Sequence, residues 1–127
     1  MAADAYLKQA SAMLQQAAAA LKQDADRLRA NASNASQQMS RDISAMQNDL
    51  SARRSEQSRA KDQPETYAAL EAEVRRLESS IADMQQQLDQ TTSQAEQAAG
   101  AKEGAISGLQ SQATALDRQA GDPAIRS

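Results

Sequence analysis

The sequence predicts an all-α protein built as a long antiparallel two-helix coiled-coil hairpin. Apolar residues recur every three or four positions along two long stretches, as they do on the contact face of a coiled-coil helix. A single strong helix break, Asp62-Gln63-Pro64-Glu65, separates the two stretches. The composition agrees, because 40% of the residues are hydrophobic but only 2% are aromatic, which is too little bulk for a compact globular core.

The first predicted helix spans about residues 3–60. Leucine recurs every seven residues, and small residues such as Ser11 and Ala18 occupy the alternate core position of the heptad. The apolar spacing then lengthens to two successive steps of four, through Ala35, Met39 and Ile43, a stutter that locally unwinds a supercoil. We expect this helix to contribute the following residues to the helix–helix seam: Leu7, Leu14, Leu21, Leu28, Ile43 and Leu50.

The predicted turn lies at residues 61–63. Asp62 is the expected N-cap of the next helix, with Pro64 in its first turn and Glu65 three residues after the cap. Such a short connection makes the helices antiparallel, so facing residues should have numbers that sum to roughly 127. This register places Arg53 and Arg54 near the acidic residues at the start of the second helix.

The second predicted helix spans about residues 64–120. Its seam begins at Tyr67, weakens through Thr91, Ala95 and Ala98, and recovers at Ile106. Gly121 and the following Asp-Pro pair should end the helix, which leaves residues 121–127 as a frayed tail of a single hairpin domain. The seam residues expected from this helix are Leu70, Leu77, Ile81, Leu88, Leu109 and Leu116.

Three glycines, Gly100, Gly104 and Gly108, recur at intervals of four in the second helix. One interpretation is a groove in which the helix closely approaches residues 17–20 of the first helix. The alternative is a hinge, because glycine destabilises a helix interior. A hinge would break the second helix near Gly100 and produce three helices.

The residue types that are missing argue against catalysis. The chain has no His and no Cys, which removes the commonest general base, the soft metal ligands and the thiol nucleophile. No glycine-rich phosphate-binding motif occurs. We therefore expect a protein that is not an enzyme, with no catalytic residue, no cofactor, no metal and no small-molecule substrate.

Charge and hydropathy give expectations about partners and localisation. The net charge of −3 argues against nucleic acid as the main partner. No apolar run is long enough to span a bilayer, so integral membrane insertion is not expected. The N-terminal residues do not follow the pattern of a secretory leader, which favours a cytoplasmic protein or export without a cleaved leader.

These features favour a structural or scaffold coiled-coil protein that acts by helix packing and self-assembly. Alanine-rich flanks such as Ala17, Ala19 and Ala20 leave apolar surface beside the seam, which a homo-oligomer would cover. One alternative is an adaptor or chaperone-like hairpin that binds another helical protein, as in secretion or phage assembly machinery. A second alternative is a binder of anionic membrane or nucleic-acid surfaces through a basic tip formed by Arg53, Arg54, Arg59 and Lys61.

Overall fold

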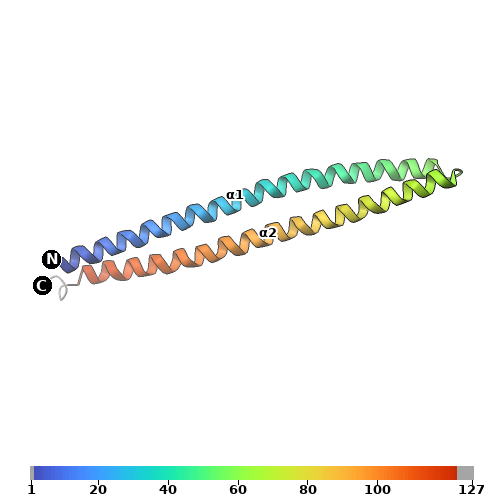
Figure 1. Ribbon diagram of the computed structural model, residues 1–127. Coiled ribbons are helices and arrows are strands. Elements are labelled where there is room, and N and C mark those ends of the chain that lie inside the picture. The colour runs from blue at the N-terminus through green and yellow to red at the C-terminus, as the bar shows by residue number, and fades with distance from the viewer. Residues whose placement is uncertain (1, 123–127) are drawn as a thin grey trace. The chain divides into compact units, whose positions relative to one another are not determined.

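The computed structural model describes residues 2–122, which form two long helices and no strand. Helix α1 spans Ala2–Arg59 and helix α2 spans Pro64–Ala120 (Figure 1). The helices pack against each other, which confirms the predicted all-α hairpin, and the helix ends lie within one residue of the predicted ones. Residues 123–127, most of the predicted frayed tail, lie outside the described residues.

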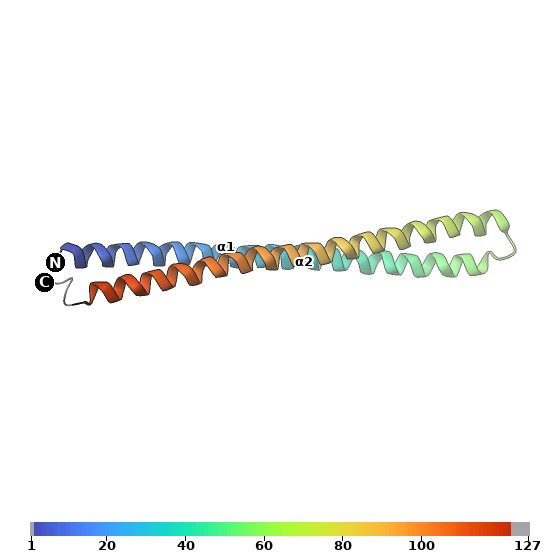
Figure 2. The same cartoon turned by 90° about the horizontal axis from the view of Figure 1, so that it is seen from below.

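The chain divides into two compact units, each made from a segment of both helices. The described part of unit 1 contains residues 2–31 and 95–122, and unit 2 contains residues 32–94. In unit 1 the blue part of α1 lies beside the orange-to-red part of α2, and in unit 2 the cyan-to-green part of α1 lies beside the yellow part of α2 (Figures 1 and 2).

Unit 2 has a core of branched aliphatic side chains. The buried residues of this cluster are Ile43, Leu50, Val74 and Ile81. Around them pack the partly buried Met46, Leu77, Met84 and Leu88. Burial of one such side chain stabilises a fold by about 1.5–3 kcal/mol, so this seam carries most of the apolar stabilisation in unit 2.

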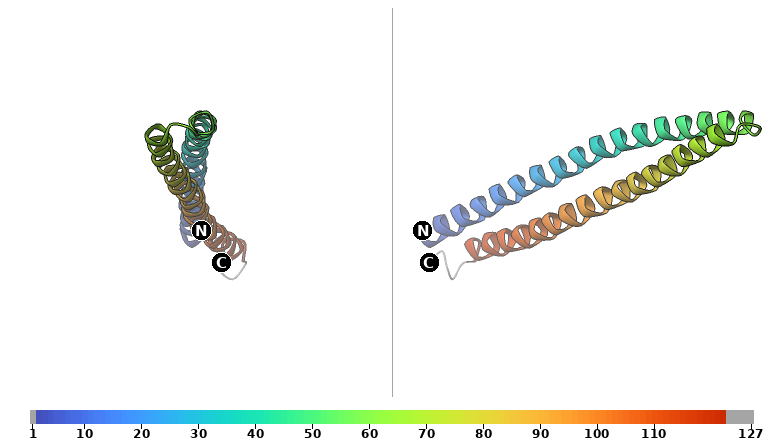
Figure 3. Two further views of the ribbon diagram at one scale, coloured as in Figure 1. Left: turned by 90° about the vertical axis from the view of Figure 1, so that its right-hand side faces the viewer. Right: turned by 45° about the vertical axis from the view of Figure 1, so that its right-hand side comes forward.

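The turn that joins the helices belongs to unit 2 (Figure 3). The N–H of Gln63 donates to the carbonyl of Ala60 at 2.9 Å, and the N–H of Tyr67 donates to the carbonyl of Gln63 at 2.8 Å. Helix α2 therefore starts with Pro64 in its first position, where a missing N–H costs nothing. The N-cap is Gln63 and not Asp62, because the carbonyl of Gln63 accepts the first helical hydrogen bond.

Unit 1 has a core of small side chains. Its most buried residues are Ser11, Ala18, Ala25, Ala99, Ala113 and Ala120, whereas Leu7, Leu14, Leu109 and Leu116 are half-buried. A small residue at every second core position lets the two helix backbones approach closely, and the leucines then lie along the edges of the contact. Unit 1 thus buries much less apolar area per seam position than unit 2.

Helix α2 runs without interruption past its three central glycines, so the predicted alternative of a break near Gly100 is wrong. The groove interpretation is wrong as well. A Cβ added at Gly100, Gly104 or Gly108 would meet no atom within 4 Å, so these residues do not approach α1. All three are exposed on the outer surface of α2.

Two seam positions differ from the prediction. Ala99 is completely buried while Ala98 is exposed, because α2 continues with steps of four from Thr91 to Ala95 and Ala99. The sequence pattern does not reveal this second stutter, because both residue 98 and residue 99 are alanine and either could occupy the seam. Tyr67 is 37% exposed, so the seam of α2 effectively begins at Leu70. At the other end α2 stops at Ala120 as predicted, although Gly121 does not adopt the left-handed conformation of a typical glycine cap.

Candidate functional site

None of the twelve predicted seam residues is exposed. Ile43, Leu50 and Ile81 are buried. The other nine predicted positions are half-buried, among them Leu21 and Leu28 in unit 1 and Leu70 and Leu88 in unit 2. The register also agrees with the prediction, since residue numbers in the interhelical pairs Ser11–Ala113, Ser36–Thr92 and Arg53–Glu73 add to values close to 127. The seam is therefore a packing surface within one chain.

Ser11 is the one polar residue among the buried side chains described for the chain, with an exposed fraction of 2%. Its hydroxyl donates to the carbonyl of Ala113 on α2 at 3.2 Å, and the side-chain amide of Gln15 donates to the hydroxyl oxygen of Ser11 at 3.5 Å. A buried hydroxyl is tolerated when it is hydrogen-bonded. This contact ties a specific residue of α1 to a specific residue of α2.

One side of unit 1 is charged. Arg29 donates to the carboxylates of both Glu96, at 3.3 Å, and Glu103. The hydrogen bond from Arg29 lowers the pKa of the Glu103 carboxyl below its usual range, because it stabilises the ionised form. Arg29 stands one residue after a seam leucine of α1, and Glu96 and Glu103 each stand one residue after a seam position of α2. In an antiparallel pair of helices, residues that follow seam positions lie on the same side of the pair, so this side carries the charges.

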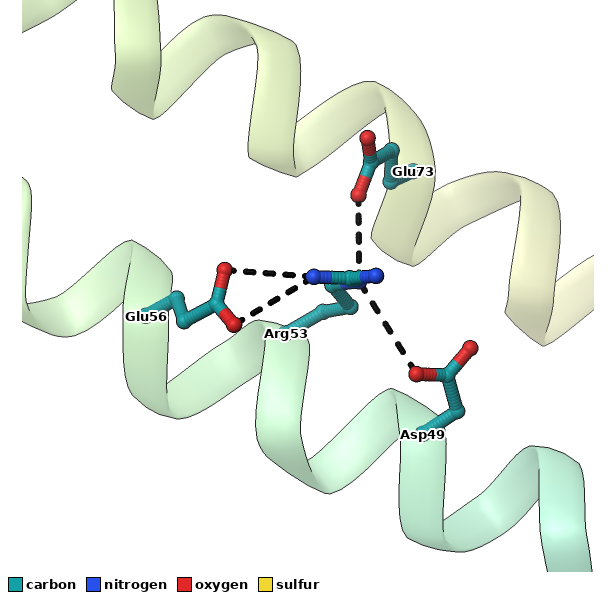
Figure 4. Close-up of polar contacts among 4 residues, drawn as sticks. All are labelled: Asp49, Arg53, Glu56 and Glu73. Atoms are coloured by element: carbon teal, nitrogen blue, oxygen red, sulfur yellow. Dashed lines mark hydrogen bonds and ion pairs between the residues drawn. The ribbon is translucent and has the colours of Figure 1, made fainter.

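In unit 2, Arg53 lies among three carboxylates (Figure 4). It approaches Glu73 of α2 at 3.2 Å, Glu56 at 3.3 Å and Asp49 at 3.9 Å, the last two on its own helix. The charges of Glu56, Glu73 and Asp49 raise the pKa of this guanidinium, which stays protonated in any case. The cluster joins the two helices and leaves no cationic surface at this position.

The predicted basic tip is therefore only partly available. Arg53 is surrounded by carboxylates, and Arg54 pairs with Glu78 of α2 at 2.7 Å. Arg59 and Lys61 make no ion pair within residues 2–122 and are exposed. Lys102 shares a shallow groove of unit 1 with Asp24, but no ion pair joins the two.

The other side of unit 1 is apolar along residues 3–20 of α1. Along α1 it presents residues that alternate in steps of three and four: Ala3, Tyr6, Ala10, Met13, Ala17 and Ala20. Tyr6 is 77% exposed and Met13 is 63% exposed, and they are the two most exposed large hydrophobic side chains in the described chain. The sequence predicted the alanine-rich flank but not the three-and-four spacing of these six residues, because the leucine heptad dominates the apolar pattern of α1.

Helix α2 continues the same apolar side. Ala98 and Ala105 each stand one residue before a buried or half-buried seam residue of α2, as Ala10 and Ala17 do on α1. In an antiparallel pair of helices, the residues that precede seam positions lie on the same side of the pair. The residues of α2 on this side are Ala98, Ala101, Ala105, Gly108, Gln112 and Ala115, and all are exposed. We call these residues, with the six from α1, the alanine face.

Eight of the twelve residues of the alanine face lie in a band that contains no charge. Helix α1 has no charged residue between Lys8 and Lys22, and α2 has none between Glu103 and Asp117. The two stretches lie side by side, because the Ser11–Ala113 hydrogen bond joins them. An exposed apolar surface with no charge in it is typical of a surface that another molecule covers.

No helix within residues 2–122 is long and apolar enough to cross a membrane, and no group of three or more acidic side chains there is arranged to hold a metal ion. Of the candidate sites in the described chain, the alanine face is the one whose composition departs furthest from an ordinary solvated helix surface. No protein-family model matches the sequence, and no curated protein or solved structure is significantly similar to it.

Proposed function

We propose that this chain is a non-enzymatic structural protein that self-assembles through helix–helix packing. The observation that carries the proposal is the exposure of Tyr6 and Met13 within the uncharged alanine face of unit 1. A monomer that kept this surface in water would forgo the stabilisation that its burial offers, about 25 cal/mol for each Å² of apolar area.

The accessible surface of the chain is large enough for such an interface. It amounts to 8764 Å², whereas a compact monomer of the same 13.6 kDa exposes about 6,600 Å². The difference, about 2,200 Å², exceeds the roughly 800 Å² that each partner buries in a stable interface of standard size. The chain therefore has enough surface to assemble without unfolding its hairpin.

Sedimentation velocity and light scattering from micromolar to millimolar protein would test this function. We expect species heavier than 13.6 kDa whose population grows with concentration. A strict monomer at every concentration would contradict self-assembly.

An adaptor that binds a different helical protein is the alternative use of the same face. That alternative predicts a monomer that becomes a discrete complex only with its protein partner, so the solution mass of the pure protein separates the two functions.

A further inference from the structure

We propose that the alanine face docks against the alanine face of a second copy of this chain, antiparallel, about a two-fold axis through the middle of the uncharged band. The inference rests on the self-assembly proposed above and names the interface and its geometry. The product is a local four-helix bundle formed by unit 1 of each copy.

The first argument is the spacing of the alanine-face residues on α1. The run Ala3, Tyr6, Ala10, Met13, Ala17, Ala20 has the three-and-four alternation of a coiled-coil seam. The part of α1 that belongs to unit 1 therefore carries two seams on adjacent faces. Helix α2 occupies the leucine seam, and nothing within the described chain occupies this second one, as the 77% and 63% exposure of its two large residues shows.

The second argument is the absence of charge. A partner selected by electrostatics would meet complementary charges, yet neither α1 between Lys8 and Lys22 nor α2 between Glu103 and Asp117 offers any. A second copy presents an equally uncharged face. Placing one uncharged band on the other desolvates no unpaired charge, whereas a charged partner surface would lose its hydration without compensation.

The third argument is that the face complements itself in size. A two-fold axis at the middle of the band places Met13 opposite Ala17 of the second copy and Ala10 opposite Ala20 of the second copy. Met13 against Ala17 sets large against small, which fills space without voids, and Ala10 against Ala20 lets the two α1 helices approach closely. The same axis places Tyr6 opposite Asp24 of the second copy, where the phenol can donate to the carboxylate.

Helix α2 fits the same arrangement. With the axis at the middle of its uncharged stretch, Gly108 lies opposite Gln112 of the second copy and Ala105 lies opposite Ala115 of the second copy. The open space around a Cβ built at Gly108 is then the space that the second copy fills. The small residues Ala105, Gly108 and Ala115 allow the two α2 helices to approach closely.

Matched glutamate variants provide the first test. Met13→Glu with Ala20→Glu places two charges on the alanine face, and Ala12→Glu with Ala19→Glu places the same charges one residue away, on the other side of α1. All four residues are exposed in the single chain, so both variants should keep the circular dichroism of the native hairpin. We expect the face variant to raise the dissociation constant of the assembly at least about tenfold, because buried unpaired charge is costly, and the control to leave it within about twofold.

Cross-linking provides the second test, since the chain has no cysteine of its own. Ala17→Cys should be joined to its symmetry mate by a short bismaleimide, whereas Ala19→Cys should not. If the wild-type protein assembles but the two glutamate variants dissociate alike, the proposed interface is wrong and the proposed self-assembly is retained. The same holds if the wild-type protein assembles but a cysteine at position 17 is not cross-linked. If the wild-type protein is a monomer throughout, both proposals are wrong.

Discussion

At the scale of single residues, Ser11 shows how a small buried group can define a register. Its hydroxyl is buried, donates to the carbonyl of Ala113 and sits where a larger side chain would separate the helices. The sequence placed Ser11 on the seam but did not show that its hydroxyl has a partner. That partner is a backbone carbonyl of a residue far along the chain, which side-chain patterns do not reveal.

Replacement of Ser11 should depend on size more than on polarity. Ser11→Ala should change the free energy of unfolding by about 1 kcal/mol or less, because one neutral hydrogen bond is lost and no cavity of consequence is formed. Ser11→Leu should destabilise the protein by about 1–3 kcal/mol through overpacking. Urea unfolding followed by circular dichroism measures both values, and equal effects of the two variants would contradict close packing at this position.

The ion pair between Arg29 and Glu103 predicts how the stability of the fold depends on pH. Its pKa in the folded protein is lowered by Arg29, so the pair stabilises the fold above the ordinary carboxyl pKa of about 4.3 and this contribution is lost as the pH falls through the lowered pKa. Glu103→Gln should therefore reduce stability at neutral pH, and its difference from wild type should vanish in acid. In an Arg29→Gln background the same substitution should have no pH-dependent effect, and persistence of that effect would show that Arg29 is not the cause.

At the scale of the elements, the helices follow from local chemistry. The break near Pro64 and the seam spacing predicted α1 and α2 to within one residue at each end. The glycine stretch was harder, because glycine weakens a helix without forbidding it. The continuous α2 shows that packing along the rest of unit 1 outweighs the propensity cost of three exposed glycines.

Those glycines should be sites where the helix can be stabilised. Gly104→Ala adds a Cβ that meets no atom within 4 Å, so it should stabilise α2 by up to about 1 kcal/mol. Thermal and urea unfolding of the variant measure the gain. A loss of stability would show that a neighbour absent from the single chain occupies that space.

At the scale of the whole molecule, the two units differ in what they bury. Unit 2 packs Ile43, Leu50, Val74 and Ile81, whereas unit 1 packs mainly alanine and serine against half-buried leucine. Apolar stabilisation scales with the area buried, so unit 1 should open locally more easily than unit 2.

Amide hydrogen exchange tests that difference. In dilute protein, the amides of residues 11–25 should exchange faster than those of residues 43–50. If unit 1 assembles through its alanine face, raising the protein concentration should slow exchange in unit 1 and leave unit 2 unchanged. Uniform protection along α1 at every concentration would contradict both the weaker core and the assembly through unit 1.

The sequence by itself determined the helices, their antiparallel order and the approximate register, because heptad spacing, a proline and a charge pattern are local and readable. Only the tertiary structure decided which alanine of α2 is buried, that Gln63 caps α2, and that Gly100, Gly104 and Gly108 face outward. The physical reason is that alanine and glycine are small enough to suit either side of a helix. Their placement is set by the larger residues that pack around them, and the same leucine seam leaves Tyr6 and Met13 exposed beside it.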